Sequence, residues 1–178
     1  MKKTIFGIFV LSILLTSCSP KLTPFTQRLY KENDWSEAEL KRIQFYLSED
    51  IVLRRVAESS RSRIEDGEIR VINGGKTEKV VIRRGTLGVF VFTPKADRFA
   101  ISFESGDDRY LMFGPNPKAS NRYLLLASEW KKRGGMVTYG GKRYRVDSDD
   151  AYATLMVDLR KVRKVSVKSR TAGGRKVN

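Results

Sequence analysis

The chain has 178 residues, a formal net charge of +15, a single cysteine and no histidine. Its length fits one domain of ordinary size, and its 40% apolar content is enough to build a hydrophobic core. The lack of histidine excludes the commonest general base, the Ser-His and Cys-His nucleophile pairs and the usual zinc sites. A single cysteine excludes an internal disulfide, so stability must come from packing.

The N-terminus combines a basic start, Lys2-Lys3, with an apolar run from Ile5 to Leu15. This order is typical of a secretory signal peptide, and the run is shorter than the roughly 20 residues that a membrane-spanning helix needs. The sequence Leu15-Thr16-Ser17-Cys18 resembles the lipobox of bacterial lipoproteins. The resemblance implies a signal peptide at residues 1–17, cleavage before Cys18, and lipidation of Cys18 with acyl chains such as palmitate.

The residues after Cys18 indicate which membrane carries the protein and which side of it the domain faces. In the enterobacterial sorting pattern, Asp after the lipidated cysteine retains a lipoprotein at the inner membrane, whereas this chain has Ser19. The resemblance therefore implies an outer-membrane anchor. Some lineages mark surface-displayed lipoproteins with acidic residues just after the cysteine, but the first acidic residue here is Glu32. We therefore expect an inward-facing, periplasmic domain.

The next segment has the composition of a linker and then a helix start. Pro20, Pro24 and scattered polar residues predict a lipidated tether over residues 18–34. Ser36 and Glu39 match a capping box, which predicts a short helix over 36–42 and then a strand through Leu47. Residues 51–56 predict a further strand, or the same strand continued after a bulge.

Beyond residue 68 the pattern is that of β-structure. Asn73-Gly74-Gly75 and Gly140-Gly141 predict hairpin turns, because glycine accepts positive φ. The stretch 87–92 predicts a strand buried on both faces and ended by Pro94, and 114–117 predicts a loop. Strands are expected at 69–72, 80–82, 87–92, 99–103, 110–113, 122–127, 136–139, 142–146, 153–159 and 162–167.

Short strands with regular turn signals predict the fold class: a mainly β protein with one antiparallel sandwich or small barrel and a short N-terminal helix. This β-rich domain is expected at residues 35–168 and is followed by a basic, disordered tail at 169–178. The segment from Val80 to Val89 resembles the strand–turn–strand opening of SH3-like small barrels, with Gly85 and Gly88 at the bend. The resemblance implies the barrel form but names no function.

Two acidic groups are candidate sites of chemistry. Asp147-Ser148-Asp149-Asp150 resembles the start of a calcium loop, but Ala151 stands where a third ligand is needed, so a solvated turn is favoured. Glu104, Asp107 and Asp108 could serve glycoside hydrolysis only if two of them faced one groove. We therefore predict no catalytic residue, no metal site and no cofactor.

The basic C-terminal residues form the candidate site for an anionic partner, with a solubilising tail as the alternative. They are Arg160, Lys161, Arg163, Lys164, Lys168 and Arg170, and the patch could extend to Arg54, Arg55, Arg61, Arg63, Arg83 and Arg84.

The sequence predicts a lipid-anchored envelope protein with a non-catalytic binding or assembly-accessory role. Its membrane contact is the N-terminal lipid, and its partner is an envelope protein or an anionic cell-wall polymer, not nucleic acid. The alternative is a module that binds peptidoglycan or lipopolysaccharide through its basic surface. A carboxylate-dependent hydrolase comes third.

Overall fold

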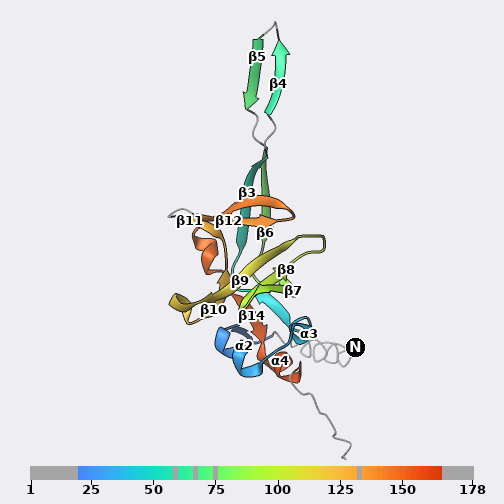
Figure 1. Ribbon diagram of the computed structural model, residues 1–178, viewed down its shortest axis with the longest axis vertical. Helices are drawn as coiled ribbons and strands as arrows, with labels where there is room; N and C mark the ends of the chain where they lie inside the picture. The colour runs from blue at the N-terminus through green and yellow to red at the C-terminus, as the bar shows by residue number, and fades with distance from the viewer. Residues whose placement is uncertain (1–19, 58–59, 66–67, 74–75, 132–133, 166–178) are drawn as a thin grey trace, which may run out of the picture.

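The computed structural model describes residues 20–57, 60–65, 68–73, 76–131 and 134–165. The predicted signal peptide, Cys18 and the predicted tail at 169–178 lie outside these residues. The described part is mainly β-structure in antiparallel sheets with a few short helices, as the sequence predicted (Figure 1).

The larger sheet has seven strands within the described residues, and every neighbouring pair in it is antiparallel. Their spatial order is β1 (Leu22–Pro24), β14 (Leu155–Asp158), β2 (Gln44–Leu47), β7 (Leu87–Lys95), β8 (Arg98–Ser102), β9 (Tyr110–Asn116) and β10 (Arg122–Leu125).

The second sheet has five antiparallel strands in the described part of the chain. Their order is β11 (Ser128–Lys131), β12 (Gly134–Tyr139), β13 (Lys142–Val146), β3 (Ile51–Ala57) and β6 (Lys76–Ile82). Strands β4 (Ser60–Glu65) and β5 (Glu68–Asn73) pair only with each other, and in Figure 1 this ribbon stands away from the two sheets. Strand β11 has no counterpart among the predicted strands.

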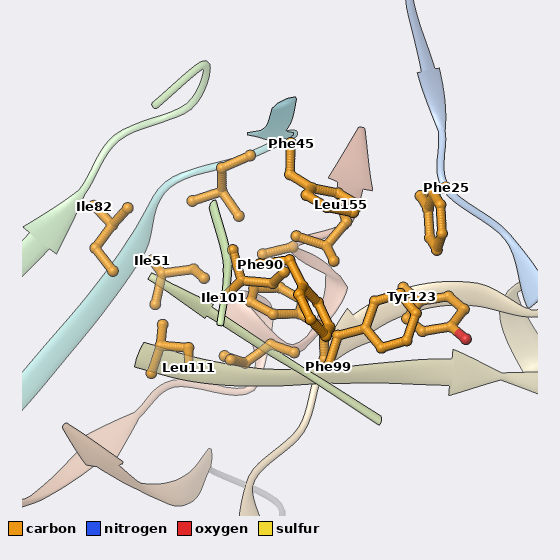
Figure 2. Close-up of a cluster of buried hydrophobic side chains, with 14 of the residues drawn as sticks. Phe25, Phe45, Ile51, Ile82, Phe90, Phe99, Ile101, Leu111, Tyr123 and Leu155 are labelled. Atoms are coloured by element: carbon orange, nitrogen blue, oxygen red, sulfur yellow. The ribbon is translucent and has the colours of Figure 1, made fainter. Parts of the chain in front are cut away.

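The two sheets share one hydrophobic core, so the arrangement is a sandwich. The core combines Phe45, Phe99 and Ile101 of the larger sheet with Leu53 and Val146 of the smaller one. Figure 2 shows aromatic rings gathered there, with the Phe99 and Tyr123 ring centroids 4.7 Å apart. The larger sheet does not close: only isolated bridges join β10 to Thr26 and to Thr154. The small-barrel alternative is therefore wrong for the described residues.

The predicted tether at 18–34 is largely part of the folded domain. Strand β1 pairs with β14, and the Phe25 side chain is fully buried against Phe45 and Tyr123. Helix α2 (Gln27–Asn33) follows, with the Thr26 hydroxyl accepting a hydrogen bond from the Leu29 amide at 3.2 Å. Pro24 suggested a linker, but β1 is an edge strand, where proline's missing N–H costs no ladder bond.

The predicted capping box is confirmed at helix α3 (Glu37–Leu40), where the Ser36 amide donates to Glu39 Oε2 at 2.9 Å. Leu40 and Trp35 on either side of the cap are both buried. Strand β2 then runs to Leu47, as expected, and β3 belongs to the other sheet, so the chain crosses between sheets after residue 47.

One of the two predicted hairpins forms. Gly140 and Gly141, with φ of +55° and +69°, connect β12 to β13, and Tyr139 lies opposite Lys142. This is the two-residue turn with positive φ at both positions.

The hairpin predicted at Asn73-Gly74-Gly75 is wrong, because β5 pairs with β4 and β6 pairs with β3. Asn73 lies opposite Ser60, and Lys76 lies opposite Ala57, so β5 and β6 run in the same direction along one ribbon. Glycines signal permitted backbone angles, but they do not identify the pairing partner of a strand. Residues 74 and 75 themselves lie outside the described part.

Three local predictions are also corrected. The strand expected at 162–167 is instead helix α4 (Leu159–Val165), which begins next to Asp158, whose Oδ1 accepts from the Arg160 amide at 3.1 Å. Strand β9 continues through the loop expected at 114–117 as far as Asn116, and β7 continues past Pro94 to Lys95.

Strand β7 is also not buried on both faces. Leu87 and Val89 are 56% and 52% exposed, because the outer face of the larger sheet is uncovered there.

Candidate binding groove

A groove of about 500 Å³ lies between the five-stranded sheet and the loop that connects β8 to β9. Its lining comes from β6, β12, β13, the β12–β13 turn and that loop. The lining residues are Lys79, Val80, Val81, Glu104, Arg109, Tyr139, Gly140, Lys142 and Tyr144. Strand β6 is the last strand of its sheet and pairs with β3 on one side only among the described residues. Lys142 and Tyr144 lie on β13, which β3 separates from β6, so the groove crosses the face of this sheet and reaches its unpaired edge at β6.

One wall of the groove is fixed by a hydrogen bond between the two sheets. The Tyr139 hydroxyl donates to Glu104 Oε1 at 2.7 Å, and Arg109 Nη1 lies 3.5 Å from the same oxygen. The Gly140 amide also donates to the Asp108 carbonyl at 2.8 Å. The β12–β13 turn and the loop after β8 are therefore held together.

The other wall is built around Glu78. Its carboxylate lies 2.7 Å from Arg55 Nε and 3.6 Å from Lys142 Nζ, and accepts from the Tyr144 hydroxyl at 3.2 Å. The Arg55 guanidinium also lies over the Tyr144 ring, 5.9 Å from its centroid. This cluster links β3, β6 and β13 at the groove.

The protonation states of these groups follow from their surroundings. Burial raises the pKa of Tyr139, and the hydrogen bond to Glu104 and that carboxylate's charge raise it further. The pKa of Tyr144 is raised for the same reasons, with Glu78 as the carboxylate. Burial alone would raise the pKa of Glu78, but Arg55, Lys142 and the Tyr144 hydrogen bond lower it overall. Near neutral pH the tyrosines are thus neutral donors and Glu78 is anionic.

The outer face of the five-stranded sheet carries a second, basic feature. Arg145 lies opposite Arg54, and Arg54 lies opposite Lys79, so three cations form one row across β13, β3 and β6. Arg54 is paired with Asp147, and Arg143 Nη2 lies 2.7 Å from Glu129 Oε1. An adjoining groove of about 480 Å³ is lined by Arg54, Arg55, Thr77, Met136, Arg143 and Arg145.

The structure separates the predicted C-terminal basic residues from these grooves. Arg160 and Lys161 lie on α4, at the opposite end of the molecule from β4 and β5 in Figure 1. Arg160 Nη2 lies 3.2 Å from Oδ2 of the buried Asp158. Arg163 and Lys164 belong to the same helix, whereas Lys168 and Arg170 lie outside the described residues. Arg54 and Arg55, which the sequence indicates as an extension of the patch, line the groove on the outer face of the five-stranded sheet.

The acidic candidate residues make contacts within the fold. Asp147 pairs with Arg54, its amide donates to Asp150 Oδ2 at 3.1 Å, and residues 149–152 form a short 3₁₀ helix. The segment therefore forms a short 3₁₀ turn between β13 and β14. Of Glu104, Asp107 and Asp108, only Glu104 lines the groove. Among the described residues, no three acidic, histidine or cysteine side chains gather closely enough to hold a metal ion.

Sequence reasoning missed the groove beside β6. The alternation of Arg143 and Arg145 with Tyr144 and Val146 predicts a strand with one basic face, but that face lines the second groove and not this one. What the sequence did not contain is the strand order that places β6 at an edge.

The chain shows no significant match to any protein-family model, curated protein or solved structure. No helix in the described ranges is long and apolar enough to cross a membrane.

Proposed function

We propose that this chain is a lipid-anchored protein of the bacterial envelope with a non-catalytic binding or assembly-accessory role. The observation that carries the proposal is the groove that crosses the five-stranded sheet and reaches the unpaired edge of β6. An edge strand offers free backbone N–H and C=O groups, to which an extended segment of another protein can pair as an added strand. The groove supplies side-chain contacts beside that edge.

The side chains of the groove favour an acidic or polar partner segment. Lys79, Arg109 and Lys142 line it, and the carboxylates beside them are Glu104, 3.5 Å from Arg109, and Glu78, 3.6 Å from Lys142. The cations therefore outnumber the carboxylates, and Lys79 is in no salt bridge within the described residues. Val81, which is 41% exposed, adds an apolar contact point beside Lys79. Such an edge gives affinity through the backbone and selectivity through alternate side chains.

The chemistry of the same groove supports binding rather than catalysis. The raised pKa values of Tyr139 and Tyr144 keep both hydroxyls protonated near neutral pH, and the lowered pKa of Glu78 keeps it anionic and paired with Arg55. A general acid or base needs a pKa near the working pH. These three groups are therefore suited to holding the walls of a binding groove.

The test is photo-crosslinking in intact cells with a crosslinking amino acid at Val81. Tyr152, which is 66% exposed and does not line this groove, is the matched control position. We expect one specific envelope protein to be captured from position 81 and not from position 152. Capture of the same proteins from both positions, or none from position 81, contradicts the proposal.

The basic row favours a second candidate, an anionic cell-wall polymer such as peptidoglycan or lipopolysaccharide. Arg145, Arg54 and Lys79 stand side by side on one sheet face, which suits repeated negative charges. This alternative predicts sedimentation with purified cell-wall material that weakens as salt is added. The double variant Arg143→Gln/Arg145→Gln should then lose sedimentation, whereas crosslinking from position 81 should be unchanged.

The location proposed for the domain is the periplasmic face of the outer membrane. The basis is the lipobox-like sequence before Cys18, Ser19 directly after it, and the absence of acidic residues before Glu32. Protease added to intact cells should leave the protein whole and should degrade it once the outer membrane is opened. Digestion in intact cells means an outward-facing domain.

A further inference from the structure

The proposed lipid site is only four residues from a fixed position in the sheet. Leu22 begins β1 and lies opposite Asp158 of β14. A fully extended chain covers at most about 3.6 Å per residue, so four residues span about 14 Å. Since residues 22–34 belong to the folded domain, a lipid on Cys18 holds the end of the sheet at Leu22 close to the bilayer surface.

Basic side chains gather at this end of the sheet. Arg42, between α3 and β2, and Lys161 of α4 line the same small recess as Asp158, the partner of Leu22. Both side chains are exposed, and so is Lys21, next to Leu22. Neither Arg42 nor Lys161 is in a salt bridge within the described part of the chain. The end that must approach the membrane is therefore cationic.

The nearby acidic groups do not cancel this charge. Asp158 is buried and held by Arg160, whose guanidinium lies 3.2 Å away and is 60% exposed. Glu37 and Glu39 of α3 are also negatively charged, but they accept hydrogen bonds from the Thr93 amide and from Ser36, and neither lines the recess. Around the recess next to Leu22, three cations, Arg42, Arg160 and Lys161, therefore face one carboxylate, Asp158.

We propose that this end of the domain, with Lys21, Arg42 and Lys161, docks on the headgroups of anionic phospholipids. The proposal rests on the proposed lipidation of Cys18 for the orientation of the domain. Basic residues near an anionic leaflet strengthen membrane binding, and a lipid plus a basic patch anchors more firmly than either alone.

Docking at this end fixes the direction in which the rest of the molecule points. In Figure 1, α2, α3 and α4 lie at one end, and the ribbon of β4 and β5 lies at the other. Strands β3 and β6 connect in sequence to that ribbon. The domain therefore presents β6 and its groove away from the bilayer.

The test uses the processed chain from residue 18 with Cys18→Ser, so that no lipid contributes to binding. Sedimentation with vesicles of phosphatidylglycerol and phosphatidylcholine compares Arg42→Gln/Lys161→Gln with Arg83→Gln/Arg84→Gln. The two variants lose the same charge, but the second loses it from the exposed turn between β6 and β7. At about fivefold per cation near the surface, we expect the first to lose about 25-fold in partition coefficient and the second less than about threefold.

Each outcome of this comparison has one meaning. Equal losses in the two variants, or no binding of the parent chain to phosphatidylglycerol vesicles, overturn the docking surface. Thermal melts of both variants show whether either has lost its fold. Two other experiments test the proposed function independently of membrane docking. Palmitate labelling of the native chain in cells tests the lipidation of Cys18, and crosslinking from position 81 tests partner binding at the groove.

Discussion

The Tyr139 hydroxyl donates a hydrogen bond to Glu104 Oε1 at 2.7 Å, and this bond connects the five-stranded sheet to the loop that follows β8 of the larger sheet. Tyr139 is 3% exposed, so its hydroxyl has little access to water as a replacement partner. The same bond forms one wall of the candidate groove. Sheet packing and the shape of the groove therefore depend on one contact.

Replacing Tyr139 with Phe should destabilise the fold by about 1–2 kcal/mol, because a hydrogen bond to a carboxylate is lost while the ring stays in place. Urea denaturation measures this change. Tyr152→Phe, at a 66% exposed side chain, is the control and should leave the midpoint unchanged. Equal midpoints for Tyr139→Phe and the parent chain mean that the contact with Glu104 contributes nothing to stability.

Tyr123→Phe, unlike Tyr139→Phe, should not lower the stability of the fold. The Tyr123 side chain is fully buried, and its hydroxyl has no hydrogen-bond partner within the described structure. Burial raises its pKa, so the group stays neutral. Removing an unpaired buried hydroxyl should leave stability unchanged or increase it by up to about 1 kcal/mol. A clear loss in the urea midpoint means that the hydroxyl has a partner, such as a buried water.

Stability should fall in acid partly through Glu78. Its pKa is lowered in the folded state, so it contributes stability above its unfolded-state pKa and loses that contribution as the pH falls through its folded-state pKa. The Glu78→Gln variant should therefore be less stable than the parent near neutral pH, and the difference should shrink as the pH falls below the ordinary pKa of a glutamate. Urea midpoints of both chains across that range measure the effect. A difference that is independent of pH would falsify the assigned role of the Glu78 charge.

Gly141→Val should be destabilising by about 1–3 kcal/mol. No atom lies within 4 Å of a Cβ placed at Gly141, so the cost comes from its φ of +69° and not from a clash. Asn accepts this backbone region far better than a β-branched residue does, so Gly141→Asn is the matched control. Thermal melts compare the two variants. If the Val variant melts with the Asn variant, the turn tolerates another conformation.

Cys18→Ala should abolish lipidation and move the protein out of the detergent phase. Two acyl chains anchor a protein stably to a membrane, whereas one is marginal, and the Ala variant has neither. Palmitate labelling and detergent-phase partitioning measure the loss, with Ser17→Ala as a control that keeps the cysteine. Unchanged processing and membrane association in the Cys18→Ala variant contradict the lipoprotein interpretation.

The sequence alone predicted those features of the structure that depend on residues close together in the chain. Ser36 and Glu39 are three apart, so the start of α3 was readable without tertiary information. Gly140 and Gly141 accept positive φ by themselves, so the β12–β13 turn was readable too. Alternating apolar residues predicted a mainly β domain, because one face of each strand must be buried wherever the strand lies.

The tertiary structure decided everything that depends on partners distant in the chain. Pro24 and Phe25 looked like part of a linker until pairing with β14 and burial against Tyr123 placed them in the domain. Gly74 and Gly75 suggested a hairpin, but β6 pairs with β3 instead. The groove exists because β6, β12 and β13 meet the loop that carries Glu104 and Arg109. The order of the strands and the burial of each side chain depend on contacts between segments that are distant in the sequence. The composition of a single segment therefore does not specify them.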